Sequence, residues 1–320
     1  MNLSALTLRF DRTLERRLAR IGSLWLATLP LLTPATPALG QQDSIAEARR
    51  VIERELAPLD ASRQALHARL AATHGTAGAD SSFWIWYGGY RDLVDSLARR
   101  LNVPLLDVLI DPLGATGQSL LRQRHQEVPP TETPRQRATM QAIRALLEAH
   151  GVRAADAEGD VEYSPSYASL RVLAAPFLSD LSRDVLALLV LEQAQPAGRD
   201  AALDISWAAL ADRLARSDAL LARRPLPAAD SLILGHYRSY LTAYLGAWDN
   251  TPGFAFDPPH ELLPALRASY AMYVRSHPDT RSGRIIRAYV ALLRTHHWRR
   301  GPEVDAFVRD AARDAARGRR

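Results

Sequence analysis

The sequence of 320 residues contains no cysteine and no lysine, so all 40 basic side chains are arginine. Without cysteine the chain has no thiolate nucleophile, no thiolate ligand for zinc or iron–sulfur clusters, no disulfide and no lipid-modified cysteine. Without lysine it has no Schiff-base amine and no phosphate-binding lysine of a P-loop, because a guanidinium cannot replace an amine in either role. Lipoproteins and several enzyme classes are therefore excluded.

Stretches that alternate with period two are scarce, and runs of β-branched residues are missing. Apolar residues recur instead at helical spacing, as in the face formed by Phe83, Tyr87, Tyr90 and Val94. We therefore predict an all-α fold, either an irregular helical bundle or a short helical-pair solenoid. The predicted helices cover residues 43–74, 83–101, 104–111, 115–126, 134–150, 165–175, 179–194, 204–223, 229–248, 258–276, 281–298 and 302–317.

A long hydrophobic run is also missing. A basic region with five arginines precedes an apolar stretch of about twelve residues, Ile21–Leu32, whereas a membrane-spanning helix needs roughly 17 to 25. Ala38 and Gly40 fit the small-x-small rule for signal cleavage. We predict that residues 1–40 are a cleaved signal peptide and that the protein is periplasmic or secreted. An amphipathic N-terminal helix of a cytosolic protein is the alternative.

Helix-terminating residues mark two stretches as linkers. Residues 129–134 contain three prolines, and residues 154–160 combine small, acidic and glycine residues. The second stretch predicts a border between an N-terminal helical unit, residues 41–155, and a C-terminal helical-pair unit with a basic tail, residues 156–320. Asp257 is followed by two prolines, which predicts a helix N-cap with proline at the first helical position.

An internal repeat lies in the C-terminal half. A shift of 51 residues aligns Arg224, Pro227, Ser231, Leu234 and Leu241 with Arg275, Pro278, Ser282, Ile285 and Leu292. The pattern predicts a helix, a turn with proline and a second helix. Residues 208–297 thereby resemble the inter-repeat junctions of tetratricopeptide-like proteins, many of which act in bacterial envelopes. The resemblance implies helical pairs and no particular partner.

Metal-ligand spacing is absent among the nine histidines, because no two of them lie three or four residues apart. Asp257 and His260 are the one carboxylate and imidazole pair a turn apart, and Asp257 already serves as the predicted cap. The acidic residues 156–162 surround a glycine that is wrongly placed for an EF-hand loop. We predict no metal site and no cofactor.

Two carboxylates provide the best candidates for catalysis. Asp107 and Asp111 lie four residues apart in an otherwise apolar run, so they would share one helical face. Burial and mutual repulsion would raise the pKa of one of them, as general acid catalysis requires. The structural alternative is a short helix between Pro104 and Pro112 with one aspartate near each end.

Aromatic residues form a stripe on the predicted helix 229–248. Its members are Tyr237, Tyr240, Tyr244 and Trp248. Tyrosine is an unusual choice for a purely apolar core because its hydroxyl needs a partner, so the stripe is a candidate ligand-binding surface for a glycan or peptide. The structural alternative is a helical core with hydroxyls that reach the surface.

Charge of one sign gathers at the two ends of the chain. The net charge is +5; residues 1–40 and residues 309–320 carry +3 each, which leaves −1 on residues 41–308. The high isoelectric point therefore results from the positive charge at the two ends of the chain, and we expect no nucleic-acid partner. If arginine-rich helices bound DNA, the retention of the protein on DNA would fall steeply as the salt concentration rises.

These patterns favour an exported helical protein that binds or scaffolds an envelope protein, a peptide or a glycan. We expect no permanent membrane span. The alternative function is an envelope glycan hydrolase that uses Asp107 and Asp111.

Overall fold

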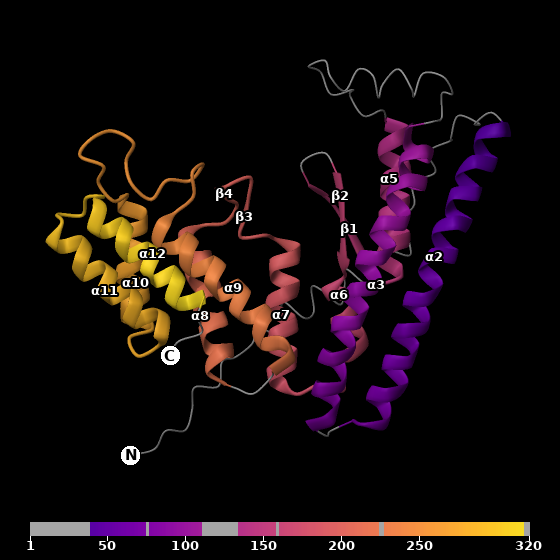
Figure 1. Ribbon diagram of the computed structural model, residues 1–320, viewed down its shortest axis with the longest axis horizontal. Coiled ribbons are helices and arrows are strands. Elements are labelled where there is room, and N and C mark those ends of the chain that lie inside the picture. The colour runs from indigo at the N-terminus through magenta and orange to yellow at the C-terminus, as the bar shows by residue number, and fades with distance from the viewer. Residues whose placement is uncertain (1–38, 75–76, 111–133, 158–159, 224–226, 317–320) are drawn as a thin grey trace, which may run out of the picture. The chain divides into compact units, whose positions relative to one another are not determined.

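The computed structural model describes residues 39–74, 77–110, 134–157, 160–223 and 227–316, which form ten helices and four short strands. The helices are α2 (Leu39–Ala72), α3 (Ala77–Ile110), α5 (Pro134–Ala149), α6 (Tyr167–Ala174), α7 (Asp180–Ala194), α8 (Trp207–Ala222), α9 (Pro227–Gly246), α10 (Pro264–Ser276), α11 (Arg281–Thr295) and α12 (Pro302–Ala316). The strands are β1 (Val152–Ala157), β2 (Asp160–Pro165), β3 (Gly198–Arg199) and β4 (Ala202–Leu203). Over these residues the prediction of a mainly helical fold is confirmed (Figure 1).

The chain divides into two units, Met1–Ala46 and Glu47–Arg320. The predicted signal peptide, residues 1–40, lies almost entirely outside the described residues, as does the predicted helix 115–126. Within the described ranges, no helix is long and apolar enough to cross a membrane.

Helices α2 and α3 are both long, and each contains a proline. The sequence predicts a break or kink at Pro58 and a separate helix over residues 104–111. Helix α2 is continuous through Pro58, and α3 continues through Pro104 to Ile110, so the prediction of a separate helix is wrong. A proline removes one main-chain hydrogen bond, and buried side chains on both sides of it can hold the helix together. In α2 the buried residues Leu56 and Leu59 flank Pro58.

The predicted apolar face of α3 is buried along its length. Phe83, Tyr87, Tyr90 and Val94 are each at most 3% exposed. The indole of Trp86, beside this face, donates from Nε1 to Ser62 Oγ of α2 at 2.8 Å. The helical period of the sequence therefore correctly identifies which side of α3 packs against the rest of the fold.

A β-hairpin follows α5 where the sequence predicts a linker. β1 and β2 pair antiparallel, from Val152 opposite Pro165 to Ala157 opposite Asp160. The linker prediction for residues 154–160 is therefore wrong for the paired residues. Valine and tyrosine alternate with polar residues along β2, and this period of two was the available signal for a strand. The pairing spans the predicted border between residues 155 and 156.

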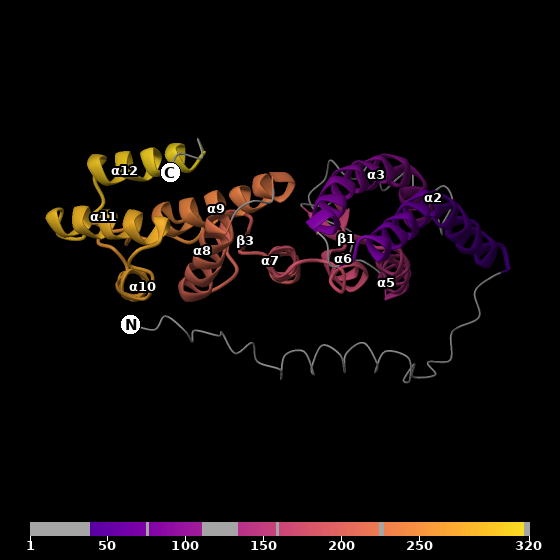
Figure 2. The same ribbon diagram turned by 90° about the horizontal axis from the view of Figure 1, so that it is seen from below.

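Pairs of consecutive helices that pack on each other make up the C-terminal part. α8 packs on α9, α10 on α11, and α8 also contacts α10. Figure 2 shows α8 and α10 on one side of α9 and α11, with α12 on the other. α10 begins at Pro264, with Leu263 as its N-cap. The prediction that Asp257 caps this helix is wrong, because residues 257–263 form a loop held by bridges such as Phe254 to Leu262.

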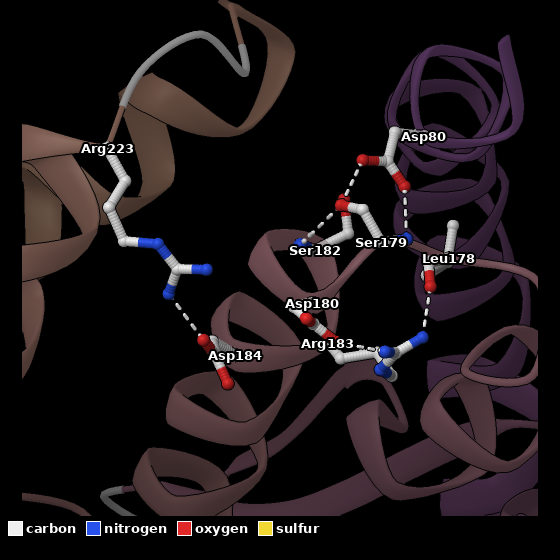
Figure 3. A network of polar contacts seen from close by, with 8 residues as sticks. All are labelled: Asp80, Leu178, Ser179, Asp180, Ser182, Arg183, Asp184 and Arg223. Atoms are coloured by element: carbon white, nitrogen blue, oxygen red, sulfur yellow. Dashed lines mark hydrogen bonds and ion pairs between the residues drawn. The ribbon is translucent and has the colours of Figure 1, made fainter. Parts of the chain in front are cut away.

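A polar junction joins α3, α7 and α8 (Figure 3). Asp80 in the first turn of α3 accepts hydrogen bonds from the backbone N–H of Ser179, at 2.9 Å, and from its hydroxyl. Ser179 is itself the N-cap of α7 and accepts from the N–H of Ser182. At the next turn, Asp184 forms an ion pair with Arg223 at the end of α8. The N-terminus of α7 is thereby fixed between two neighbouring helices.

Candidate functional site

A mainly apolar cavity lies between α8 and α10. α8 buries Leu210, Leu214 and Leu220 in the core, and its alanines at residues 208 and 211 line the cavity. α10 turns Leu266, Tyr270 and Tyr273 inward. The remaining surface between the two helices is therefore formed mainly by small side chains.

We call this cavity the α8–α10 groove. Its volume is about 460 Å³, and its lining is Ser206, Trp207, Ala208, Ala211, Asp212, Ala265, Ala268, Ser269, Met272, Tyr273, Ser276 and His277. Met272 is 57% exposed, which is unusual for so large an apolar side chain. Trp207 is half-buried at the start of α8. The groove thus combines exposed apolar surface with walls of alanine.

Most polar groups that line the groove are already engaged. Ser206 Oγ accepts from the N–H of Ala209 at 3.2 Å, because Ser206 is the N-cap of α8. The hydroxyl of Ser269 is 2.6 Å from that of Tyr244. The carboxylate of Asp212 pairs with Arg216 one turn along α8, at 2.7 Å. The groove is nevertheless lined largely by alanines, Met272 and Trp207, so it suits an apolar side chain.

The predicted tyrosine stripe lies inside the helical core. Tyr237, Tyr240 and Tyr244 are each at most 1% exposed. Burial raises the pKa of each phenol above its ordinary value. The hydroxyl of Tyr240 donates to Glu192 Oε2 at 2.7 Å, and that of Tyr237 has no hydrogen-bond partner among the described residues. These three tyrosines are closed to solvent, and the role of the stripe in ligand binding stays a prediction.

Trp248, the fourth member of the stripe, lies apart from the three tyrosines in the turn after α9. Its ring packs directly over Gly198, where an added Cβ would lie 1.7 Å from the ring. The half-buried indole therefore covers the β3–β4 hairpin, and only glycine fits beneath it.

The two candidate carboxylates are placed only in part. Asp107 lies in the last turns of α3, where the backbone is described and the side chain is not. Asp111 lies outside the described residues. Their use as an acid–base pair therefore stays a prediction.

Within the described ranges, no three histidine, aspartate or glutamate side chains gather where they could hold a metal ion. Asp257 and His260, the one predicted carboxylate and imidazole pair, lie in the loop before α10. Their contact is a backbone hydrogen bond from the N–H of His260 to the carbonyl of Asp257, at 3.0 Å.

A buried ionic cluster joins α7, α8 and α9, and sequence analysis did not identify it. Arg213 is 2% exposed and pairs with Glu192 at 2.5 Å. The other oxygen of Glu192 accepts from the N–H of Ala197 at 2.8 Å. The ring of His236 stacks on Tyr240, and burial lowers the pKa of this imidazole. The one signal in the sequence was an arginine on the leucine side of α8, where a charge needs a partner.

Comparisons with protein-family models, with curated proteins and with solved structures find no match to this chain.

Proposed function

We propose that this chain is an exported helical module that binds a peptide segment of an envelope protein in the α8–α10 groove. The peptide contributes a bulky apolar side chain that fills the space between the two alanine-rich walls. Export, the periplasmic or secreted location and the resemblance to tetratricopeptide-like proteins belong to the same proposal.

The lining of the groove carries the proposal. A glycan presents hydroxyls that need hydrogen-bond partners, but the alanines and Met272 that form much of the lining offer none. An apolar side chain needs only area, and exposed Met272 and half-buried Trp207 supply it. These contacts favour a peptide over a glycan as the ligand.

Pairing of helices supports the binding module as well. Each of the pairs α8–α9 and α10–α11 buries its apolar residues between its own helices and those of its neighbour. Because α9, α11 and α12 cover the inner side, α8 and α10 present their outer sides together (Figure 2). A rigid pair of helices is a suitable platform for recognising a short segment.

The groove can be tested with random peptides displayed on phage and selected on the full chain. We expect enrichment of peptides with a large apolar residue. Their affinity should be measured by fluorescence polarisation for the protein and for Ala268→Trp, which fills the groove. Loss of one buried apolar side chain is worth about 1.5–3 kcal/mol, so Ala268→Trp should weaken binding roughly tenfold or more.

A matched control is Ala271→Trp. Ala271 is exposed on the same helix, as Ala268 is, but does not line the groove. We expect its affinity for the selected peptides to stay within about twofold of that of the unchanged protein. The proposal fails if no peptide family is enriched, or if both tryptophan variants bind the peptides equally well.

Export needs a separate test, because a cytosolic protein could have the same groove. N-terminal sequencing of the protein purified from its natural cells should give a chain that begins near residue 41. Intact Met1 in a cytosolic fraction would overturn the export proposal and leave the groove untouched.

A further inference from the structure

Phe256 is a large apolar side chain that the fold leaves in solvent. It is 76% exposed and lies in the loop of residues 247–263, which connects α9 to α10 and projects beyond the helices in Figure 1. Four large hydrophobic side chains are exposed among the described residues, and Phe256 and Met272 are two of them. Met272 lies in the α8–α10 groove. Exposed apolar side chains that gather in one region are typical of an interaction surface.

The main chain on both sides of Phe256 is held in place. The N–H of Ala255 donates to the carbonyl of Glu261 at 2.8 Å, which closes the loop on itself. The N–H of Arg300, after α11, donates to the carbonyl of His260 at 3.1 Å. A side chain presented by an ordered main chain loses little conformational freedom on binding, so Phe256 is suited to anchor a contact.

The α8–α10 groove matches this side chain in size and chemistry. An apolar cavity of roughly 150 Å³ already holds benzene. The groove has a volume of about 460 Å³ and a lining of alanines, Met272 and Trp207, so it has room for a phenyl ring and the main chain beside it. Phe256 does not line the groove of its own chain and stays exposed. A phenylalanine that fills the groove therefore comes from another molecule.

Charge also matches between the loop and one end of the groove. Asp257, next to the exposed phenylalanine, is exposed and forms no ion pair among the described residues. Arg275, in the last turn of α10, is exposed and has no ion pair among them either. It lies three residues after Met272 and so on the same side of the helix. Asp212 and Arg216, on the α8 side, pair with each other.

We infer that two copies of this chain form a dimer in which Phe256 of each copy fills the α8–α10 groove of the other. α10 has 13 residues and is about 20 Å long at 1.5 Å per residue. When two α10 helices lie antiparallel about a two-fold axis, the loop before one helix lies beside the last turn of the other. Asp257 of each copy then faces Arg275 of the other. The inference rests on the proposed function, since it uses the same groove.

Sedimentation velocity of the full chain over a concentration series tests the dimer. We expect a reversible monomer–dimer equilibrium in the micromolar range, because both contacts are small. Phe256→Ser and Ala268→Trp should each raise the dissociation constant roughly tenfold or more, since each removes the burial of a large apolar side chain. Val172→Ser is the matched control: Val172 is 81% exposed on α6, and its loss should change the dissociation constant less than about twofold.

A mixture of the two weakened variants distinguishes a lost contact from a damaged fold. Phe256→Ser keeps the groove and Ala268→Trp keeps the loop, so a mixed dimer has one intact contact where a dimer of either variant has none. We therefore expect the mixture to associate several-fold more tightly than either variant alone. A mixture that gains nothing, an unchanged protein that stays monomeric, or equal dimerisation of Phe256→Ser and Val172→Ser would overturn the inference.

Reversal of charge tests the antiparallel arrangement. Asp257→Arg and Arg275→Asp should each weaken the dimer, because each places two like charges together, and the chain that carries both changes should recover its affinity. A double variant that is no better than the single variants would refute this arrangement.

The dimer and the proposed function can fail separately. If peptides are selected by the groove but the unchanged protein stays monomeric, the dimer is refuted and the proposed function stands. If no peptide is selected but Ala268→Trp abolishes an observed dimer, the dimer stands and the proposed function fails.

Discussion

The buried carboxylate of Asp218 offers the sharpest test of how the two helix pairs are held together. Asp218 lies in α8 and is 5% exposed. Its Oδ2 accepts from the backbone N–H of Ser282 at 2.8 Å and from the hydroxyl of Ser282 at 2.5 Å. Ser282 is the second residue of α11, so an aspartate from one helix pair satisfies the N-terminus of a helix in the next.

Replacement of Asp218 by alanine leaves the N–H of Ser282 without an acceptor. The hydroxyl of Ser282 still has the hydroxyl of Tyr273 at 2.7 Å, so it loses less. A buried N–H without a partner costs about 1–3 kcal/mol, and loss of a negative charge at a helix N-terminus costs about 0.3–2 kcal/mol more. We therefore expect Asp218→Ala to lower the free energy of unfolding by about 2–4 kcal/mol.

Asp218→Asn separates these two contributions. An amide oxygen can still accept from the N–H of Ser282, so this variant loses chiefly the charge and should cost about 0.5–2 kcal/mol. Asp212→Ala is the matched control, since Asp212 is an exposed residue of the same helix with only a surface ion pair to Arg216. Asp212→Ala should lower the free energy of unfolding by less than about 0.5 kcal/mol.

Urea unfolding followed by circular dichroism measures all three variants against the unchanged protein. The expected order of stability is Asp212→Ala, then Asp218→Asn, then Asp218→Ala as the least stable. An asparagine variant that is as unstable as the alanine variant would show that the acceptor role of Asp218 is unimportant. If Asp218→Ala matched Asp212→Ala, the whole argument about the junction of the helix pairs would be refuted.

Two further predictions follow from other buried positions. Burial lowers the pKa of His236 below 6.5, so the folded state binds fewer protons than the unfolded state just below that pH, and stability should fall as the pH drops from about 7 to 5. The urea midpoint of His236→Gln should depend less on pH in this range. The midpoint of the exposed control His297→Gln should change with pH as that of the unchanged protein does. Equal pH dependence in both variants would contradict the role given to His236. Gly283→Ala should lower the melting temperature in thermal denaturation by several degrees, because its Cβ would lie 1.8 Å from the carbonyl oxygen of His277. Gly235→Ala is the control, because no atom lies within 4 Å of the added Cβ, and it should leave the melting temperature unchanged or raise it. If both variants lowered the melting temperature equally, the steric argument would be refuted.

Helical periodicity alone was sufficient to place most of the helices. The predicted segments 134–150, 179–194 and 281–298 correspond to α5, α7 and α11 within a few residues. The reason is that a helix which packs on one side must repeat its apolar residues every three or four positions, whatever it packs against. Proline was the weaker signal, because Pro58 and Pro104 lie inside helices that continue.

The β1–β2 hairpin was harder to predict from its sequence. β1 contains mostly alanine, aspartate and arginine, which have little preference for strands. It becomes a strand because β2 pairs with it and because α5 and α3 pack beside the pair. Glycine at residue 151, with a φ of 81°, lets the chain turn out of α5 into this arrangement.

The amino-acid sequence by itself determined that the protein is helical, which faces of its helices are apolar, and that cysteine and lysine chemistry is excluded. Tertiary structure decided which polar groups are satisfied: Glu192 meets Arg213, and Asp218 meets Ser282, across distances in sequence that no local pattern encodes. It also decided the candidate site. The α8–α10 groove exists because two separate helices bring small side chains together, and the sequence shows those side chains only as isolated alanines and serines.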